Sequence, residues 1–238
     1  MSTWAPKRFW TETSVIPEGD GFSVVLDGRS VRTPAKSPFV VPTQALAEAC
    51  AAEWDAQDGE VRPDTMPMTR TANSAIDKVR LQRAEVADML AAYGDSDLLC
   101  YRADTPAELV KRQAASWDPM LAWAAQTLGA KLEPRTGVIH AAQSLESQQA
   151  LSARVHQLDA FQLAGFHDLV AISGSLVLGF ATYLKAFAPE DVWHMSRVDE
   201  MWQEEQWGED EEAQALAQVK KDGFLQAAKF CEMLARLG

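Results

Sequence analysis

The stretch "GFSVVLDGRSVRTP", residues 21–34, predicts a β-hairpin and with it the fold class of the N-terminal part of the chain. Apolar residues occupy alternate positions from Phe22 to Leu26, which is the period of a strand with one buried face. Asp27-Gly28 is the strongest short hairpin signal, because the favoured two-residue turn needs a positive φ at both central positions. The alternation resumes at Val31, so a second strand is expected to follow.

Segments on either side of this hairpin extend the prediction. "RFWTETSVI" at residues 8–16 precedes it and "PFVV" at residues 38–41 follows it, each set off by proline or glycine. Such punctuation is typical of short strands joined by turns. We therefore expect a small antiparallel sheet within the first forty or so residues.

The period changes to that of a helix from Thr43 onward. Leu46, Cys50 and Trp54 fall at i, i+4 and i+8, so they share one helix face that can cover the sheet. Asp58-Gly59 and then Pro63 end this pattern. We place a domain boundary there, with an N-terminal α+β domain at residues 1–62 and a larger helical domain at residues 63–238.

Nearly everything after residue 63 has a helical pattern, and the chain is therefore predicted to be of the α+β class. Thr105-Pro106-Ala107-Glu108 matches a capping box with proline at the first helical position, which predicts a helix running toward Gly129. Further helices are expected at about 144–158, 163–186, 190–206 and 210–235. Trp54, Trp117 and Trp123 lie on apolar faces of the predicted helices and are expected in the core.

One segment, Leu169–Leu184, has no charged residue over sixteen positions. A helix that spans a membrane needs about 20 apolar residues, and this run is shorter. It also contains five glycine, serine or threonine residues, among them Gly174 and Gly179. We interpret it as the central buried helix of a bundle, in which small residues let neighbouring helices approach. A peripheral membrane factor that uses this segment is the weaker alternative.

Composition excludes several classes of partner. The chain has 238 residues and a formal net charge of -12. A surface this negative repels phosphate backbones and anionic lipid heads, so nucleic acid and membrane insertion are not expected, and a basic protein surface is the better partner. The three cysteines are far apart without C-x-x-C spacing, which predicts neither a disulfide framework nor a zinc site. The N-terminus has neither an apolar signal core nor an amphipathic presequence, so we expect a protein that is cytoplasmic or already processed.

No catalytic motif stands out in the sequence. G-x-G-x-x-G and H-E-x-x-H are both absent, and the four histidines form no i, i+4 pair. His167-Asp168 offers a base and a carboxylate, but adjacent residues are not expected to face each other on a helix. We therefore expect no catalytic residue, no cofactor and no metal. An enzyme that uses His167 or His194 with nearby carboxylates in a helical pocket stays open as the alternative function.

The acidic stretch "VDEMWQEEQWGEDEEA", residues 198–213, contains two tryptophans among eight carboxylates without a lysine or arginine. Its residues extend a helical face on which rings, an arginine and carboxylates recur every three to four positions, from Trp193 through Arg197, Glu200 and Glu204 to Trp207. Aromatic rings beside charges, on a face that the core does not need, are favoured in protein interfaces. Burial of Trp207 under the next helix is the alternative.

Several stretches in order resemble the ATP synthase F(1) α-subunit assembly chaperone family. They are "KRFW", L-D-G-R with T-P, E-W, M-P-x-T, "DLLCYRA", "WDPML" and finally E-x-x-Q-x-x-x-W-G at Glu200, Gln203, Trp207 and Gly208. The resemblance covers residues from about 7 to about 212. Mitochondrial members carry a presequence and a His-Asp pair after the W-G; this chain has "EDEEAQ" there, so it is similar to a bacterial member.

The resemblance implies a protein without enzymatic activity that binds the free α subunit of the F(1) sector and prevents its aggregation until the β subunit joins. Family members have a small N-terminal α+β domain and a larger helical domain. An acidic residue of the E-x-x-Q-x-x-x-W-G region is tied to α-subunit binding, and Glu200 is its match. We expect a partner surface formed by Glu200, Gln203, Glu204 and Trp207 on a cytoplasmic monomer; eukaryotic relatives are expected in the mitochondrial matrix.

Overall fold

The computed structural model describes residues 7–137, 139–208 and 210–234. Close contacts between Cα atoms divide the chain into two compact units. The first comprises the described parts of Met1–Arg83, Asp159–Gly165 and Lys229–Gly238, and the second comprises those of Ala84–Leu158 and Phe166–Ala228. The predicted domain boundary between residues 62 and 63 stays a prediction.

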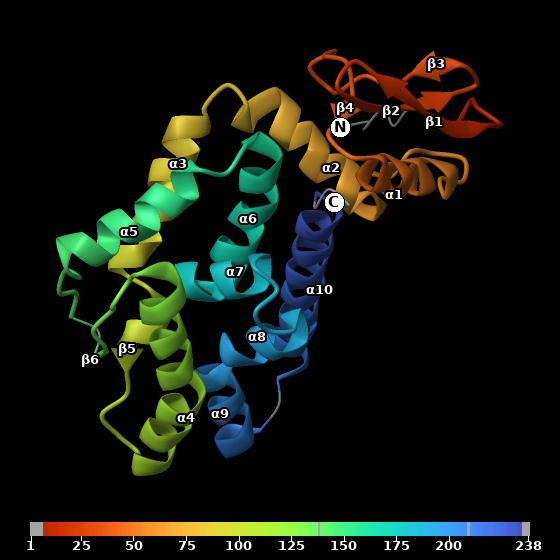
Figure 1. Ribbon diagram of the computed structural model, residues 1–238. Coiled ribbons are helices and arrows are strands. Elements are labelled where there is room, and N and C mark those ends of the chain that lie inside the picture. Colours follow the sequence, from red (N-terminus) through yellow and green to blue (C-terminus); the bar gives the residue numbers. More distant parts are fainter. Residues whose placement is uncertain (1–6, 138, 209, 235–238) are drawn as a thin grey trace. The chain divides into compact units, whose positions relative to one another are not determined.

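The first unit contains a small antiparallel sheet and the helices α1 and α2 (Figure 1). Its elements are β1 (Thr13–Glu18), β2 (Gly21–Leu26), β3 (Arg29–Ser30), β4 (Val40–Val41), α1 (Gln44–Asp55) and α2 (Pro67–Ser74). Strand β2 is central, because it pairs antiparallel with β1, β3 and β4. Helix α1 packs on β1 and β2 and buries Leu46 and Cys50. The sheet and its covering helix are confirmed.

The hairpin turn forms at the predicted residues. Asp27 has φ 46° and Gly28 has φ 79°, the positive values that this turn needs. The Asp27 carboxylate accepts backbone N–H bonds from Thr11 at 3.0 Å and from Glu12 at 2.8 Å. These bonds lower the pKa of Asp27 below its ordinary value. The turn is thus tied to the segment that enters β1.

The start of α2 is capped by a side chain of α1. The Glu53 carboxylate accepts the N–H of Met68 at 2.7 Å and that of Thr69 at 2.8 Å. These amides belong to the first turn of a helix, where no intrahelical acceptor exists. The E-W and M-P-x-T stretches of the sequence are therefore joined by bonds between the two helices. Burial of the Glu53 carboxyl raises its pKa despite these bonds.

The second unit is helical apart from a two-residue parallel pairing of β5 with β6. Its elements, some of which extend beyond it, are α3 (Arg83–Ala91), β5 (Tyr101–Arg102), α4 (Ala107–Trp123), β6 (Arg135–Thr136), α5 (Leu145–His156), α6 (Ala160–Ser173), α7 (Leu176–Tyr183), α8 (Pro189–Met195), α9 (Val198–Trp207) and α10 (Glu211–Met233). Trp117 is buried among them, whereas Trp123 is partly buried. The predicted α+β class is confirmed.

The uncharged run forms two helices, so the prediction of one buried helix over residues 169–184 is wrong. Gly174 adopts φ 72° between α6 and α7, a conformation that ends a helix. The Ser175 hydroxyl then caps α7 by accepting the N–H of Leu178 at 3.0 Å. A Cβ on Gly179 would lie 2.7 Å from Val170, so this glycine does let α6 and α7 approach closely. No helix within the described ranges is long and apolar enough to span a membrane.

Two further details differ from the sequence prediction. Residues 190–206 form two helices, because the chain leaves the helix at Ser196 and Arg197; the Ser196 hydroxyl bonds to the carbonyl of Trp193 at 2.7 Å. Helix α4 is confirmed, but its capping box is wrong. Pro106 has ψ 162° and precedes the helix, and no side chain caps it.

Candidate functional site

Helix α9 carries the four residues predicted to bind a partner, and it lies beside α4 (Figure 1). Val198 is its only buried residue. Side-chain hydrogen bonds from two residues of α4 hold it in place. Arg112 donates to both carboxylate oxygens of Glu205, each at 2.8 Å, and the buried Gln113 donates to Asp199 at 2.7 Å. Most of the α9 surface is therefore left for solvent or a partner.

Gln203 and Trp207 lie in one hollow, which we call the Trp207 groove. It has a volume of about 420 Å³ and is also lined by Tyr101, Leu109 and Asp199, among others. The indole of Trp207 is 79% exposed, so the alternative that it is buried under the next helix is wrong. An exposed tryptophan beside a hollow is a favourable anchor for a protein partner.

Glu204 and Glu200 lie outside this groove. Glu204 lines a second hollow of about 600 Å³ between α9 and α10, the Glu204 hollow. The Glu200 carboxylate accepts a bond of 2.6 Å from Arg197 and lines neither of these two hollows. The structure thus places the four predicted residues along one helix without joining them in a single cavity.

The prediction of an exposed helical face that begins at Trp193 is wrong for Trp193 itself. Trp193 is only 5% exposed and packs on Phe224, with 6.1 Å between ring centroids. The helix breaks between Met195 and Val198, after this residue. Trp193, Arg197 and Glu204 still line one hollow, with the Arg197 guanidinium 5.6 Å from the Trp193 ring, whereas Trp207 lines another. Spacing alone could not reveal this, because it assumes one unbroken helix.

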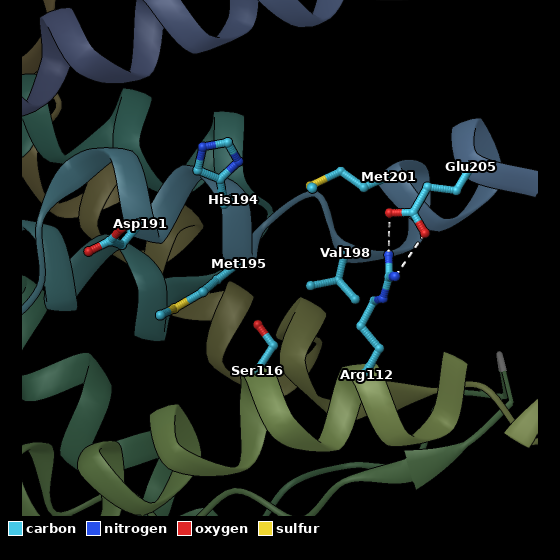
Figure 2. A pocket seen from close by; sticks show the side chains of 8 residues that line it. All are labelled: Arg112, Ser116, Asp191, His194, Met195, Val198, Met201 and Glu205. Carbon is cyan, nitrogen blue, oxygen red and sulfur yellow. Dashed lines mark hydrogen bonds and ion pairs between the residues drawn. The ribbon is translucent and has the colours of Figure 1, made fainter. Parts of the chain in front are cut away.

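A third hollow, the Met195 hollow, has a volume of about 520 Å³ between α4, α8 and α9 (Figure 2). Its lining consists of Arg112, Ser116, Asp191, His194, Met195, Val198, Met201 and Glu205. Figure 2 shows the Arg112–Glu205 bonds at one side of the hollow and Asp191 and His194 at the other. His194 and Met201 also line the Glu204 hollow, so α9 has hollows on several sides.

The Met195 hollow does not assemble an acid–base pair around His194. Among the described residues, no hydrogen bond joins His194 to Asp191 or Ser116, which line the same hollow. No group of three metal-ligating side chains is found in the described part of the chain.

His167 and Asp168 do contact each other, contrary to the expectation for adjacent helical residues. The Nδ1 of His167 lies 2.9 Å from an Asp168 oxygen, and both side chains are about half exposed. The bond to Asp168 raises the pKa of His167. Neither residue lines any of the three hollows, so the contact is a pair at the surface of α6, apart from them.

Sequence reasoning missed most of the Trp207 groove, including two residues of α9 itself. Asp199 and Trp202 stand out in the sequence only as one carboxylate and one ring of the acidic stretch. The guanidinium of Arg112 lies over the Trp202 ring at 5.2 Å, and this ring is only partly buried. Their grouping depends on contacts with α4, which no spacing within α9 encodes.

Charge in the acidic stretch is only partly balanced. Of the described carboxylates between residues 199 and 212, Glu200 and Glu205 form ion pairs, with Arg197 and Arg112. The bonds from Arg112 lower the pKa of Glu205. Asp199 and Glu204 have no cationic partner among the described residues. Glu209 lies outside the described residues. The site therefore presents rings together with uncompensated negative charge.

Comparisons with known proteins agree over most of the chain. The family model for the ATP12 chaperone protein matches residues 7–125. The mitochondrial protein atp12 of Schizosaccharomyces pombe is 26% identical over an alignment of 222 residues, which covers 88% of this chain and 76% of that protein. The crystal structure of Atp12 from Paracoccus denitrificans is 44% identical with a TM-score of 0.94, over 96% of this chain and 98% of that one. The Atu1473 protein of Agrobacterium tumefaciens is 39% identical with a TM-score of 0.93, over 97% of this chain and 87% of that one.

Proposed function

Because this chain belongs to the family of ATP12 chaperone proteins, we propose that it assists assembly of the F(1) sector of ATP synthase. It binds the unassembled α subunit and prevents its aggregation until the β subunit joins. The surface that binds is α9, with Glu200, Gln203, Glu204 and Trp207 as its contact residues. The protein acts as a cytoplasmic monomer and catalyses no reaction.

The exposed ring of Trp207 is the observation that carries this proposal. An unassembled subunit exposes an apolar surface that awaits its permanent neighbour. A chaperone needs apolar side chains of its own to cover such a surface, and an indole provides a large contact area at a small cost in conformational entropy. Trp207 is 79% exposed at the end of α9, where Gly208 with φ 89° ends the helix.

The carboxylates around the ring support a basic client surface. Complementary charge accelerates encounter and excludes wrong partners, but hydrated charges at the rim of an interface add little affinity. A contact of this kind forms quickly, and a subunit that fits the client better can still displace it. That balance suits a chaperone, which has to release its client.

Purification of the tagged protein from a lysate of its own source tests the proposal. We expect the ATP synthase α subunit to be recovered without stoichiometric β subunit, and Trp207→Ala to reduce the recovery. Ile139→Ala is the matched control, since Ile139 is also exposed in the second unit but lines none of the three hollows. Recovery of metabolic enzymes in place of the α subunit would overturn the proposal.

A further inference from the structure

The Trp207 groove has a composition that favours one kind of side chain. Its volume of about 420 Å³ is many times the roughly 30 Å³ that one water molecule takes up in the liquid. The walls combine three aromatic rings with two carboxylates: Tyr101, Trp202 and Trp207 with Asp104 and Asp199. Aromatic faces and carboxylates both attract cations.

The Asp199 carboxylate is fixed in place without being neutralised. One of its oxygens accepts the N–H of Gln113 at 2.7 Å, and its other oxygen has no partner among the described residues. Gln113 is itself engaged on its other side, because its carbonyl oxygen accepts the N–H of Ala103 at 2.8 Å. A neutral amide thus orients this acid and leaves its charge for another group. Gln113 is a positioning residue.

Arg102 is the only cation among the described residues that line the groove, and its guanidinium contacts groups other than the carboxylates of the groove. Its guanidinium pairs with Asp118 at 2.8 Å, donates to the carbonyl of Leu99 at 2.7 Å and lies over the Trp117 ring at 5.2 Å. The Arg102 side chain is 11% exposed. Among the described residues it pairs with Asp118 and forms no ion pair with Asp199, so the carboxylates of the groove keep an excess of negative charge.

The two tryptophans of the groove differ in what covers them. Arg112 already lies over the Trp202 ring at 5.2 Å, so α9 uses a guanidinium–indole contact within the fold. Within the described residues, no cation lies over the ring of Trp207. The exposed indole of Trp207 therefore offers a ring face on which a guanidinium can stack.

We propose that the Trp207 groove receives an arginine side chain of the client protein, with its guanidinium stacked on Trp207 and bonded to Asp199. This inference rests on the proposed function and names the chemistry that the client presents to α9. Arginine fits better than lysine, because a planar guanidinium stacks on a ring and bonds to a carboxylate at the same time, whereas an ammonium is a compact, strongly hydrated charge. A protein is the expected source of the guanidinium, since the net charge of -12 disfavours nucleic acid.

Titration of the full-length protein with short peptides tests this assignment. The probes are acetyl-Gly-Arg-Gly-amide and its lysine and glutamate counterparts, and the readout is the indole N–H signal of Trp207 in nuclear magnetic resonance spectra, assigned by Trp207→Leu. The arginine peptide is expected to shift this signal saturably and to bind at least about threefold more tightly than the lysine peptide. The glutamate peptide is expected to leave the signal unchanged.

Two variants complete the test. Asp199→Asn keeps an oxygen for Gln113 and is expected to weaken arginine-peptide binding by about tenfold, because a charge-assisted bond is lost. Glu190→Gln is the matched control, because Glu190 is exposed on α8 and lines none of the three hollows, and binding is expected to stay within about twofold. Equal affinity of the arginine peptide for the Asp199→Asn and unaltered proteins, or equal binding of the glutamate peptide, would overturn the inference.

Binding of the purified ATP synthase α subunit, measured in parallel, separates this inference from the proposed function. If the α subunit binds while the groove does not distinguish arginine from glutamate, the arginine site is wrong and the chaperone function stands. If the arginine peptide binds as expected while the α subunit does not, the proposed client is wrong and the arginine site stands.

Discussion

Arg112 on α4 and Glu205 on α9 form a bidentate ion pair, with both N–O distances at 2.8 Å. The side chains are 37% and 48% exposed, so the pair positions α9 more than it stabilises the whole protein. Glu205→Gln is expected to accelerate amide hydrogen exchange in α9 and to leave the thermal unfolding midpoint nearly unchanged. Asp64→Asn removes another exposed pair, that with Arg62, and is the control. Unchanged exchange in α9 would contradict a positioning role.

Trp207→Ala is expected to weaken binding of the α subunit by about 2 kcal/mol or more, which is roughly 30-fold, if the indole anchors the client. The free energy of unfolding should change little, because the side chain is 79% exposed. Calorimetric titration and urea denaturation of the same variant measure the two quantities. Equal affinity of a folded Trp207→Ala protein would remove this residue from the binding surface.

Glu53→Gln is expected to lower the free energy of unfolding by about 1–2 kcal/mol. The carboxylate accepts two backbone N–H bonds at the start of α2, and an amide side chain offers only one acceptor oxygen for them. Urea denaturation at neutral pH checks this. Glu48→Gln is the matched control, because Glu48 is exposed on the same helix and bonds only to the side chain of Gln44. A loss of equal size in the control would show that the capping bonds contribute nothing.

The pair of His167 and Asp168 makes a prediction about pH. The bond to Asp168 raises the pKa of His167 above its ordinary value of 6.5. Its folded pKa then exceeds its unfolded pKa, so the stabilisation is complete below pH 6.5 and is lost as the pH rises through the folded value. Asp168→Asn should lower the pKa of His167, measured from its ring proton signals, and should remove this pH dependence. A pKa that does not respond to Asp168→Asn would contradict the geometry.

Local signals predicted the elements of the first unit well. The Asp27-Gly28 turn, the strand that precedes it and the start of α1 after Thr43 are all encoded within a few residues, and the structure confirms each of them. The predicted alternation of buried and exposed positions in β2 is wrong, because Ser23 and Val25 are buried as well as Val24 and Leu26. In several cases, residues of the motifs that carry the family resemblance form hydrogen bonds that hold the fold together. Thr33 of the T-P stretch, for example, donates to Asp77 at 2.7 Å.

Helix breaks were harder to predict because they compete with strong periodicity. Gly174 and Ser175 interrupt an apolar run whose composition favours a continuous helix, and a glycine alone is also tolerated within helices. The grouping of Asp199 with Tyr101 and Leu109 depends on tertiary contacts between segments far apart in the sequence. The predicted partner residues are therefore placed on the right kind of surface for binding, and their role stays a prediction.

Light scattering of the isolated ATP synthase α subunit tests the central claim most directly. The account predicts that an equimolar amount of this protein suppresses aggregation of the α subunit, that Trp207→Ala suppresses it less, and that added β subunit displaces the chaperone and yields soluble assembled subunits. Aggregation of the α subunit at the same rate with and without this protein would contradict the account.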